Sequence, residues 1–166
     1  LLCIAILIDP TYSSIRKAYA NISSPSVISH GIERASHVYV NQDQARAVNY
    51  IQSHVPKGEL IYVGNSRHDI VFVSDVMFYF LAERDSATKY HELHPGMATT
   101  LSVQQDIVEN LKQSRVHYIV LYSGYENYNE PNESSVSSGV RLLDDFIRSN
   151  YYVTQQFGNY TIWERR

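Results

Sequence analysis

The chain has 166 residues, with 14 basic and 17 acidic side chains and a formal net charge of −3, and 44% of its residues are hydrophobic, as in one globular domain with its own core. This near-neutral balance argues against binding to nucleic acid through bulk charge, because phosphate neutralisation needs a basic stripe. The single cysteine, Cys3, excludes an internal disulfide framework and a CxxC metal site.

The N-terminus is an apolar run, Leu1–Ile8, that stops abruptly at Asp9-Pro10. A membrane-spanning helix needs about 20 apolar residues, and a signal-peptide core follows a basic region. Composition alone therefore favours a buried strand over the alternative, which is the end of a transmembrane helix. From residue 9 to 40 the chain is rich in serine and has no sustained hydrophobic period, so we expect a connector there.

From Asn41 onward, the sequence predicts alternating helices and strands. Asn41 can cap a helix, with Gln44 in the capping-box position, and an apolar stripe at helical spacing continues to the stop signal Pro56-Lys57-Gly58. The further predicted elements are a strand at 60–63, a buried helix at 76–82, a short strand at 87–90, a helix from about 100 to 114, a strand at 118–122, a helix at 140–149, and a hairpin of 151–157 and 160–164 that turns at Gly158-Asn159.

Strands that alternate with helices of this length predict βαβ units. We therefore expect residues 41–166 to form a single α/β domain of the three-layer, Rossmann-like kind, with a mostly parallel sheet and a C-terminal antiparallel hairpin. Ligands of such sheets bind outside the carboxyl ends of the strands. The segments 64–69 and 123–129 should then share one rim.

The densest polar cluster, Gly64–Asp69, directly follows a predicted strand. Asn65 offers hydrogen bonds, Arg67 can bind a phosphate or carboxylate through two donors, and His68 can titrate near neutral pH. The alternative is a solvated loop between a strand and a helix that binds nothing. Arg84 could hold this loop through an ion pair with Asp75 or Asp69, and structural pairing is the favoured use of these charges.

The sequence lacks the motifs of several familiar sites. The Gly64–Asp69 cluster has neither the Gly-Lys-Ser/Thr of a Walker loop nor the further glycines of a dinucleotide fingerprint. His91 and His94 are three residues apart and precede Pro95-Gly96, whereas a helical zinc motif spaces its histidines by four. Gly-x-Ser-x-Gly is also absent. No catalytic residue, metal ligand or cofactor is therefore predicted.

The stretch 41–166 resembles the soluble C-terminal domain of membrane glycosyltransferases of the protein-mannosyltransferase and aminoarabinose-transferase type. The segments that carry the resemblance are Pro56–Gly64, Phe78–Arg84 followed by Thr88-Lys89-Tyr90, Gln104–Leu111, Tyr118–Leu121 and the ending Phe157–Trp163. The resemblance covers about three quarters of the chain.

This resemblance implies a polytopic membrane protein that moves a sugar from a polyprenyl-phosphate carrier to an acceptor outside the cytoplasm. The catalytic carboxylate of such proteins lies in an early extracytoplasmic loop, and no part of this chain matches that loop. The chain would then be an extracytoplasmic domain, inactive by itself, that partners the membrane-embedded part of the same protein. It would assist binding of the acceptor or the carrier, and residues 1–8 would be the end of the last membrane helix.

From the chemistry of the loops, we expect a ligand-binding rim that faces the membrane-embedded site or its acceptor. Its members are Asn65, Arg67, His68, Arg84, Lys89 and Tyr90. Two alternative functions remain open. One is a self-contained small-ligand-binding or hydrolytic α/β domain that uses the loop from Asn65 to His68. The other is an interaction module that docks through Tyr122, Tyr125 and Tyr128.

Overall fold

The computed structural model describes residues 30–70, 73–91, 99–126 and 135–166, and it divides into two units, 1–40 and 41–166. In the first unit, a turn at His30 and Gly31 precedes a short 3-10 helix, η1 (Glu33–Ala35). The apolar run 1–8 and most of the expected connector lie outside the described residues. None of the helices in the described ranges has the length and apolar composition of a membrane span.

Apart from a short strand expected at 87–90, the second unit contains the predicted elements in the predicted order. They are α2 (Gln42–His54), β1 (Tyr62–Asn65), α3 (Met77–Ala82), α4 (Leu101–Gln113), β2 (Tyr118–Tyr122), α5 (Leu142–Asn150), β3 (Tyr151–Phe157) and β4 (Tyr160–Arg165). The Asn41 cap is confirmed, because its side chain accepts a hydrogen bond from the Gln44 amide at 2.9 Å. The short strand expected at 87–90 is replaced by a single parallel bridge between Ile61 and Ser86.

The sheet has the strand order β1-β2-β4-β3. β1 and β2 are parallel, whereas β4 is antiparallel to both β2 and β3. The expectation of a mostly parallel sheet is therefore wrong, although the mixed α/β class and the C-terminal hairpin are confirmed. The physical reason is that the hairpin pairs with β2 through its second strand, β4, which runs antiparallel to β2. β4, with Tyr160 and Ile162 buried, takes the inner position, and the more exposed β3 takes the edge.

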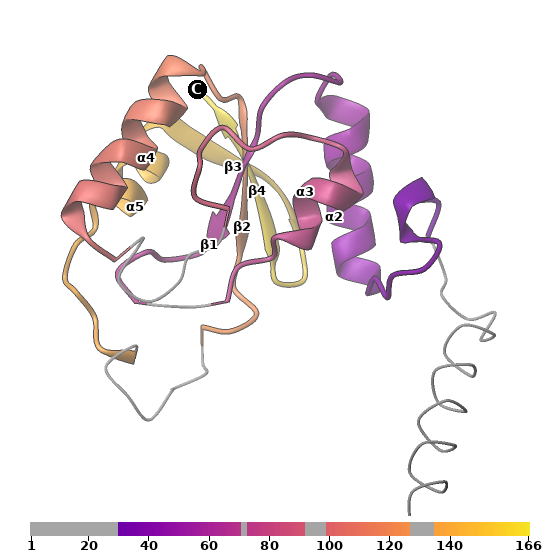
Figure 1. Cartoon of the computed structure of the whole chain (residues 1–166), viewed down its shortest axis with the longest axis horizontal. Helices are drawn as coiled ribbons and strands as arrows, with labels where there is room; N and C mark the ends of the chain where they lie inside the picture. Colours follow the sequence, from indigo (N-terminus) through magenta and orange to yellow (C-terminus); the bar gives the residue numbers. More distant parts are fainter. Residues whose placement is uncertain (1–29, 71–72, 92–98, 127–134) are drawn as a thin grey trace, which may run out of the picture. The chain divides into compact units, whose positions relative to one another are not determined.

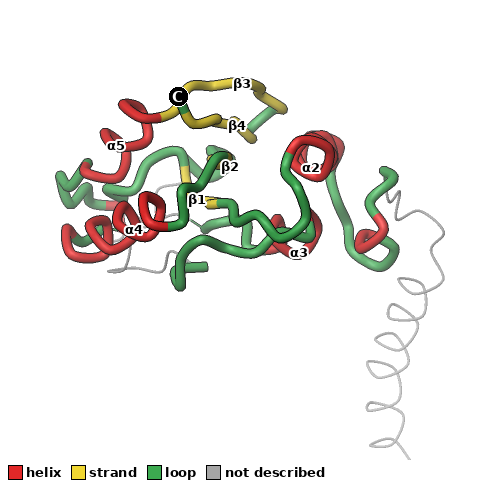
Figure 2. Tube along the Cα trace, turned by 90° about the horizontal axis from the view of Figure 1, so that it is seen from above, coloured by secondary structure: helices red, strands yellow, loops and turns green. Residues whose placement is uncertain are grey.

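Helices cover both faces of this sheet. Figures 1 and 2 show α2 and α3 on one side of the strands and α4 and α5 on the other. Residues from strands and helices form the core on the α4–α5 side; they include Tyr62, Ile119 and Leu121 of the strands, Ile107 and Leu111 of α4, and Leu143 and Ile147 of α5. On the other face, the Phe78 ring of α3 lies 5.8 Å from the Tyr160 ring, centroid to centroid.

The hairpin turn lies against the first turn of α2. Phe157 pairs with Tyr160, so the turn has two residues, and Gly158 at its first position has a φ of +53°, which is the arrangement of a type II′ turn. A Cβ on Gly158 would lie 2.1 Å from Asp43 Oδ2. The positive φ therefore favours glycine here, and a side chain at this position would also displace the Asp43 carboxylate.

Arg84 joins the ends of two helices. Its residue is 4% exposed, and its guanidinium donates to the carbonyls of Gln52 and Val55 at the end of α2 and of Ala82 and Glu83 at the end of α3. The last carbonyls of a helix have no partner within the helix. One buried side chain therefore satisfies four of these acceptors and fixes α2 against α3.

We predict that Arg84→Met lowers the free energy of unfolding by about 3 kcal/mol, because it leaves buried carbonyls without donors. Urea unfolding followed by circular dichroism measures this. The control is Arg148→Met, which changes an exposed arginine in α5 and should cost less than about 0.5 kcal/mol. Equal effects of the two substitutions would show that the Arg84 contacts do not stabilise the domain.

Candidate functional site

The loop after β1 crosses the carboxyl end of the sheet from one face to the other. On one face, His68 contacts Asp144 of α5. On the other, Asp75 accepts hydrogen bonds from Gln44 of α2 at 2.7 Å and from Tyr160 of β4 at 2.8 Å. Of the stretch between these two anchors, residues 71–72 lie outside the described part. The loop is thus tied to both helical layers.

The expectation that the loops after β1 and β2 share a rim is confirmed. Asn65 and Tyr122, the last residues of the two parallel strands, are partners in register. The Ser66 amide donates to the Tyr122 carbonyl at 3.0 Å, and the Ser66 hydroxyl donates to the Glu126 carboxylate. Of the segment 123–129, residues 127–129 lie outside the described part of the chain.

Tyr62, His68 and Asp144 form a buried chain of hydrogen bonds. Tyr62 Oη lies 2.9 Å from His68 Nε2, and His68 Nδ1 lies 2.7 Å from Asp144 Oδ1. The exposed fractions of the three residues are 0%, 1% and 6%. Burial raises the pKa of the Tyr62 phenol well above its ordinary value, so the phenol stays protonated and donates a hydrogen bond to His68 Nε2. We assign the Nδ1 proton from this network, as the donor to Asp144.

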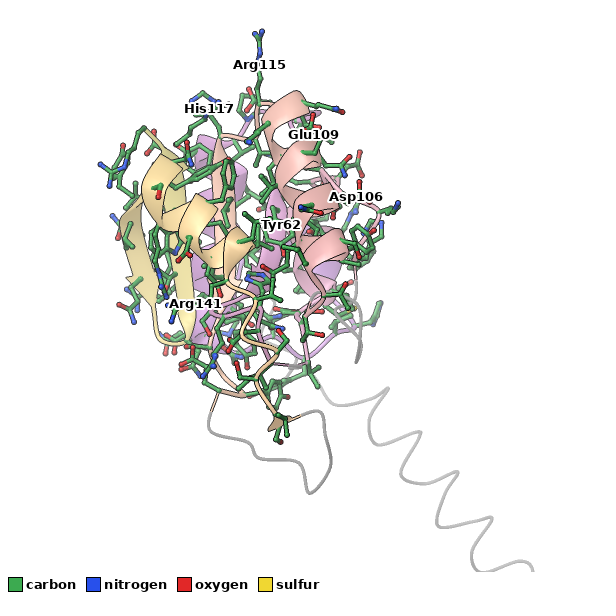
Figure 3. All side chains as sticks on the ribbon, turned by 90° about the vertical axis from the view of Figure 1, so that its left-hand side faces the viewer. Tyr62, Asp106, Glu109, Arg115, His117 and Arg141 are labelled. Atoms are coloured by element: carbon green, nitrogen blue, oxygen red, sulfur yellow. The ribbon has the colours of Figure 1, made fainter. Side chains whose placement is uncertain are left out.

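Neighbouring residues make room for this series of hydrogen bonds and bond to its members. A Cβ on Gly64 would lie 2.7 Å from a ring carbon of Tyr62 and 2.8 Å from His68 Nε2, so only glycine allows the contact. Gln104 of α4, which is fully buried, donates to the His68 carbonyl at 3.0 Å and accepts from the Leu143 amide at 2.9 Å. Figure 3 looks onto this face, with Tyr62 between α4 and α5.

A carboxylate, an imidazole and a hydroxyl in series are the groups of nucleophilic and general-base catalysis. A catalytic group must come within hydrogen-bonding reach of its substrate. Here all three side chains lie in the core, and their polar atoms bond to each other. The arrangement therefore connects β1, the loop and α5, and it presents no reactive group at the surface.

The structure separates the six residues that we expected on one rim. Asn65 and His68 are buried, at 2% and 1% exposed. Arg67 has a side chain that is 41% exposed, and it forms a two-pronged ion pair with Asp69, with Nε to Oδ1 at 2.7 Å and Nη2 to Oδ2 at 2.5 Å. Asp69 thus pairs with Arg67 and not, as one expectation had it, with Arg84.

The other three expected residues lie elsewhere. Arg84 stands beside the start of β1, where the Ile61 amide donates to the Asp85 carbonyl, and its donors are used by the helix carbonyls. Lys89 Nζ and Tyr90 Oη both contact Asp106 Oδ2 of α4, at 2.9 and 2.8 Å. The six side chains are therefore divided among three places, and a ligand-binding role for them stays a prediction.

A small hollow lies beside the carboxyl end of β2. Its volume is about 260 Å³, and it is lined by Asn41, Gln42, Asp43, Tyr122, Asn159 and Tyr160. These residues come from the start of α2, the end of β2 and the hairpin turn, which are far apart in the sequence. Our sequence reasoning missed the hollow because only the unexpected inner position of β4 brings them together. Among the described residues, no three metal-ligating side chains gather where they could hold an ion.

No family model and no curated protein matches the chain. Among solved structures, the chain is similar to the C-terminal globular domain of an oligosaccharyltransferase from Archaeoglobus fulgidus, with a TM-score of 0.43 and 10% sequence identity over 76% of this chain and 99% of that chain. Similarity at this level shows neither family nor function, so the proposals below depend on the residues themselves.

The Arg67–Asp69 pair should make stability depend on pH. Hydrogen bonds from Arg67 hold the pKa of the Asp69 carboxyl at about 2, below its ordinary value of 3.8. A carboxyl whose pKa is lowered by folding stabilises the folded state at pH values above its ordinary pKa. This stabilisation is lost as the pH falls through the pKa of the folded state. We predict that Asp69→Asn costs about 1 kcal/mol at pH 7, since solvent screens the half-exposed Arg67, and almost nothing near pH 2.

Urea unfolding of both proteins at about pH 7, 4.5 and 2 measures this difference. Glu59→Gln, which changes an exposed carboxylate, serves as the control and should show a small, constant difference. A cost of Asp69→Asn that stays constant down to pH 2 would contradict the assigned role of the pair.

Proposed function

We propose that this chain is a non-catalytic accessory domain of a membrane glycosyltransferase, and that it assists binding of the acceptor or of the polyprenyl-phosphate-linked sugar. The observation that carries this proposal is the burial of the Tyr62–His68–Asp144 chain. These side chains are the described groups best arranged for acid–base chemistry, and they are used to hold the fold together. We therefore propose binding, and not catalysis, as the contribution of the domain.

The class of enzyme comes from the sequence resemblance, whose segments occupy defined places in the fold. Tyr118–Leu121 forms most of β2, and Phe157–Trp163 forms the hairpin turn and most of β4. Phe78–Arg84 forms most of α3 and the arginine that fixes it to α2. The resemblance thus rests on segments that build one connected body. We place this body on the extracytoplasmic side, next to the membrane-embedded part of the same protein.

A tyrosine docking patch is the second candidate. Tyr125 is 44% exposed, Tyr122 is half-buried, and their ring centroids are 5.8 Å apart. Exposed aromatic side chains of this kind are common in protein interfaces. Tyr128, the third member that we expected, lies outside the described residues. Such a patch would support contact with an acceptor protein and is compatible with the first proposal.

A transfer assay tests the proposed function. We expect no sugar transfer from the isolated 166-residue chain with a polyprenyl-phosphate sugar and an acceptor. In membranes that contain the complete gene product, deletion of residues 41–166 should lower kcat/KM for the acceptor at least tenfold, because a binding surface is lost.

Two results would overturn the proposal. One is turnover by the isolated 166-residue protein that Tyr62→Phe abolishes, because the buried Tyr62–His68–Asp144 hydrogen bonds would then take part in catalysis. The other is an unchanged kcat/KM after the deletion, because the domain would then contribute nothing to transfer. The level of the truncated protein in the membrane, measured by immunoblot, controls for its loss.

A further inference from the structure

The hollow beside β2 has an aromatic wall. Tyr122 and Tyr160 are partners across β2 and β4, and their ring centroids are 4.8 Å apart. The Tyr160 hydroxyl donates to Asp75 at 2.8 Å, and Gln44 of α2 donates to the same oxygen. Burial, together with the charge of Asp75, raises the pKa of Tyr160, so its phenol remains a donor. The Tyr160 half of the wall is therefore held in place by Asp75 before any ligand arrives.

The opposite side of the hollow is polar. Asn41, Gln42 and Asn159 are exposed, and Asp43 is partly exposed. The Asp43 carboxylate lies next to Gly158 and 4.0 Å from the Arg46 guanidinium, and the Asn41 side chain is positioned by its cap on α2. Amide side chains offer both donors and acceptors, and a carboxylate offers acceptors only. This side can therefore bind a group that carries several hydroxyls.

Charge and size narrow the class of ligand. Of the six described residues that line the hollow, Asp43 is acidic and none is Lys, Arg or His. The side chains of the lining therefore carry a negative charge that opposes an anionic ligand, while the first turn of α2 adds backbone N–H donors. A volume of about 260 Å³ is just below the range of pockets for drug-sized ligands. A ligand with one apolar face, several hydroxyls and no negative charge fits these properties.

We propose that the hollow binds a single neutral pyranose ring, with the C–H face of the sugar against Tyr122 and its hydroxyls on Asp43 and Asn159. This inference rests on the proposed function and deepens it. The domain would contact the sugar itself, and the phosphate of the carrier would be bound elsewhere.

An NMR titration of the 166-residue chain tests this proposal. The probes are methyl α-D-mannopyranoside and methyl β-D-glucopyranoside, with inorganic phosphate in a parallel series. We expect at least one glycoside to shift the backbone amide signals of residues 41–43, 122 and 159–160, with a Kd of about 1–10 mM, as for a small weak ligand. Phosphate should leave these signals unchanged.

Matched variants test whether the glycoside binds against the Tyr122 ring. Tyr122→Leu should weaken glycoside binding at least tenfold, and Tyr122→Phe should retain it. The control Tyr152→Leu removes an exposed ring of β3 that does not line the hollow, and the affinity of this variant should stay within twofold of that of the original chain. If the NMR spectrum of Tyr122→Leu shows that this variant does not fold, Asp43→Asn takes its place. We expect Asp43→Asn to weaken glycoside binding threefold or more.

The proposal is overturned if neither glycoside binds, if phosphate shifts these signals instead, or if the informative variant binds as tightly as the original chain. Each of these results leaves the proposed function standing, because the transfer assay measures the need for the whole domain. Conversely, glycoside binding at the hollow together with an unaffected transfer rate would remove the proposed function and keep the sugar site.

Discussion

The described structure depends on one constraint: a polar loop that enters the core must satisfy its hydrogen bonds there. Burying a phenol, an imidazole and a carboxylate without partners would cost several kcal/mol. Tyr62, His68 and Asp144 meet this cost by bonding in series, and Gly64 leaves the room that the series needs. Because the members come from β1, the following loop and α5, the series fixes how these elements meet.

The hollow is connected to this constraint through the same loop. The loop is anchored at His68 on one face of the sheet and at Asp75 on the other. Asp75 in turn holds the hydroxyl of Tyr160, which forms the aromatic wall of the hollow with Tyr122. A buried network that performs no chemistry can therefore still position a binding surface, since it determines where the second anchor of the loop lies.

Local features of the fold could be predicted from the sequence. The cap at Asn41 and the turn at Gly158 each depend on residues within three positions of each other, and such short-range chemistry is visible in the sequence. The direction and order of the strands could not be predicted in this way. Strand pairing depends on contacts between distant segments, and β4 beside β2 is such a case.

The candidate site was harder to predict for the same reason. The loop containing His68 could be located because polar residues follow an apolar strand, but its partners had no local signal. Asp144 belongs to the first turn of α5, and Gln104 is the fourth residue of α4. In the sequence, neither residue differs from a polar residue on the solvated face of a helix. Arg84 was expected to pair with an acid and binds carbonyls instead. Long-range burial alone distinguishes these roles.

The central claim, that the Tyr62–His68–Asp144 chain is sealed in the core, can be tested by chemical accessibility. Diethylpyrocarbonate modifies exposed imidazoles, and mass spectrometry of the folded chain measures the rate at each histidine. The account predicts that His68 remains unmodified while the exposed His54 and His117 react, and that unfolding in urea makes all three reactive. Modification of His68 in the folded chain at a rate similar to that of His117 would contradict it.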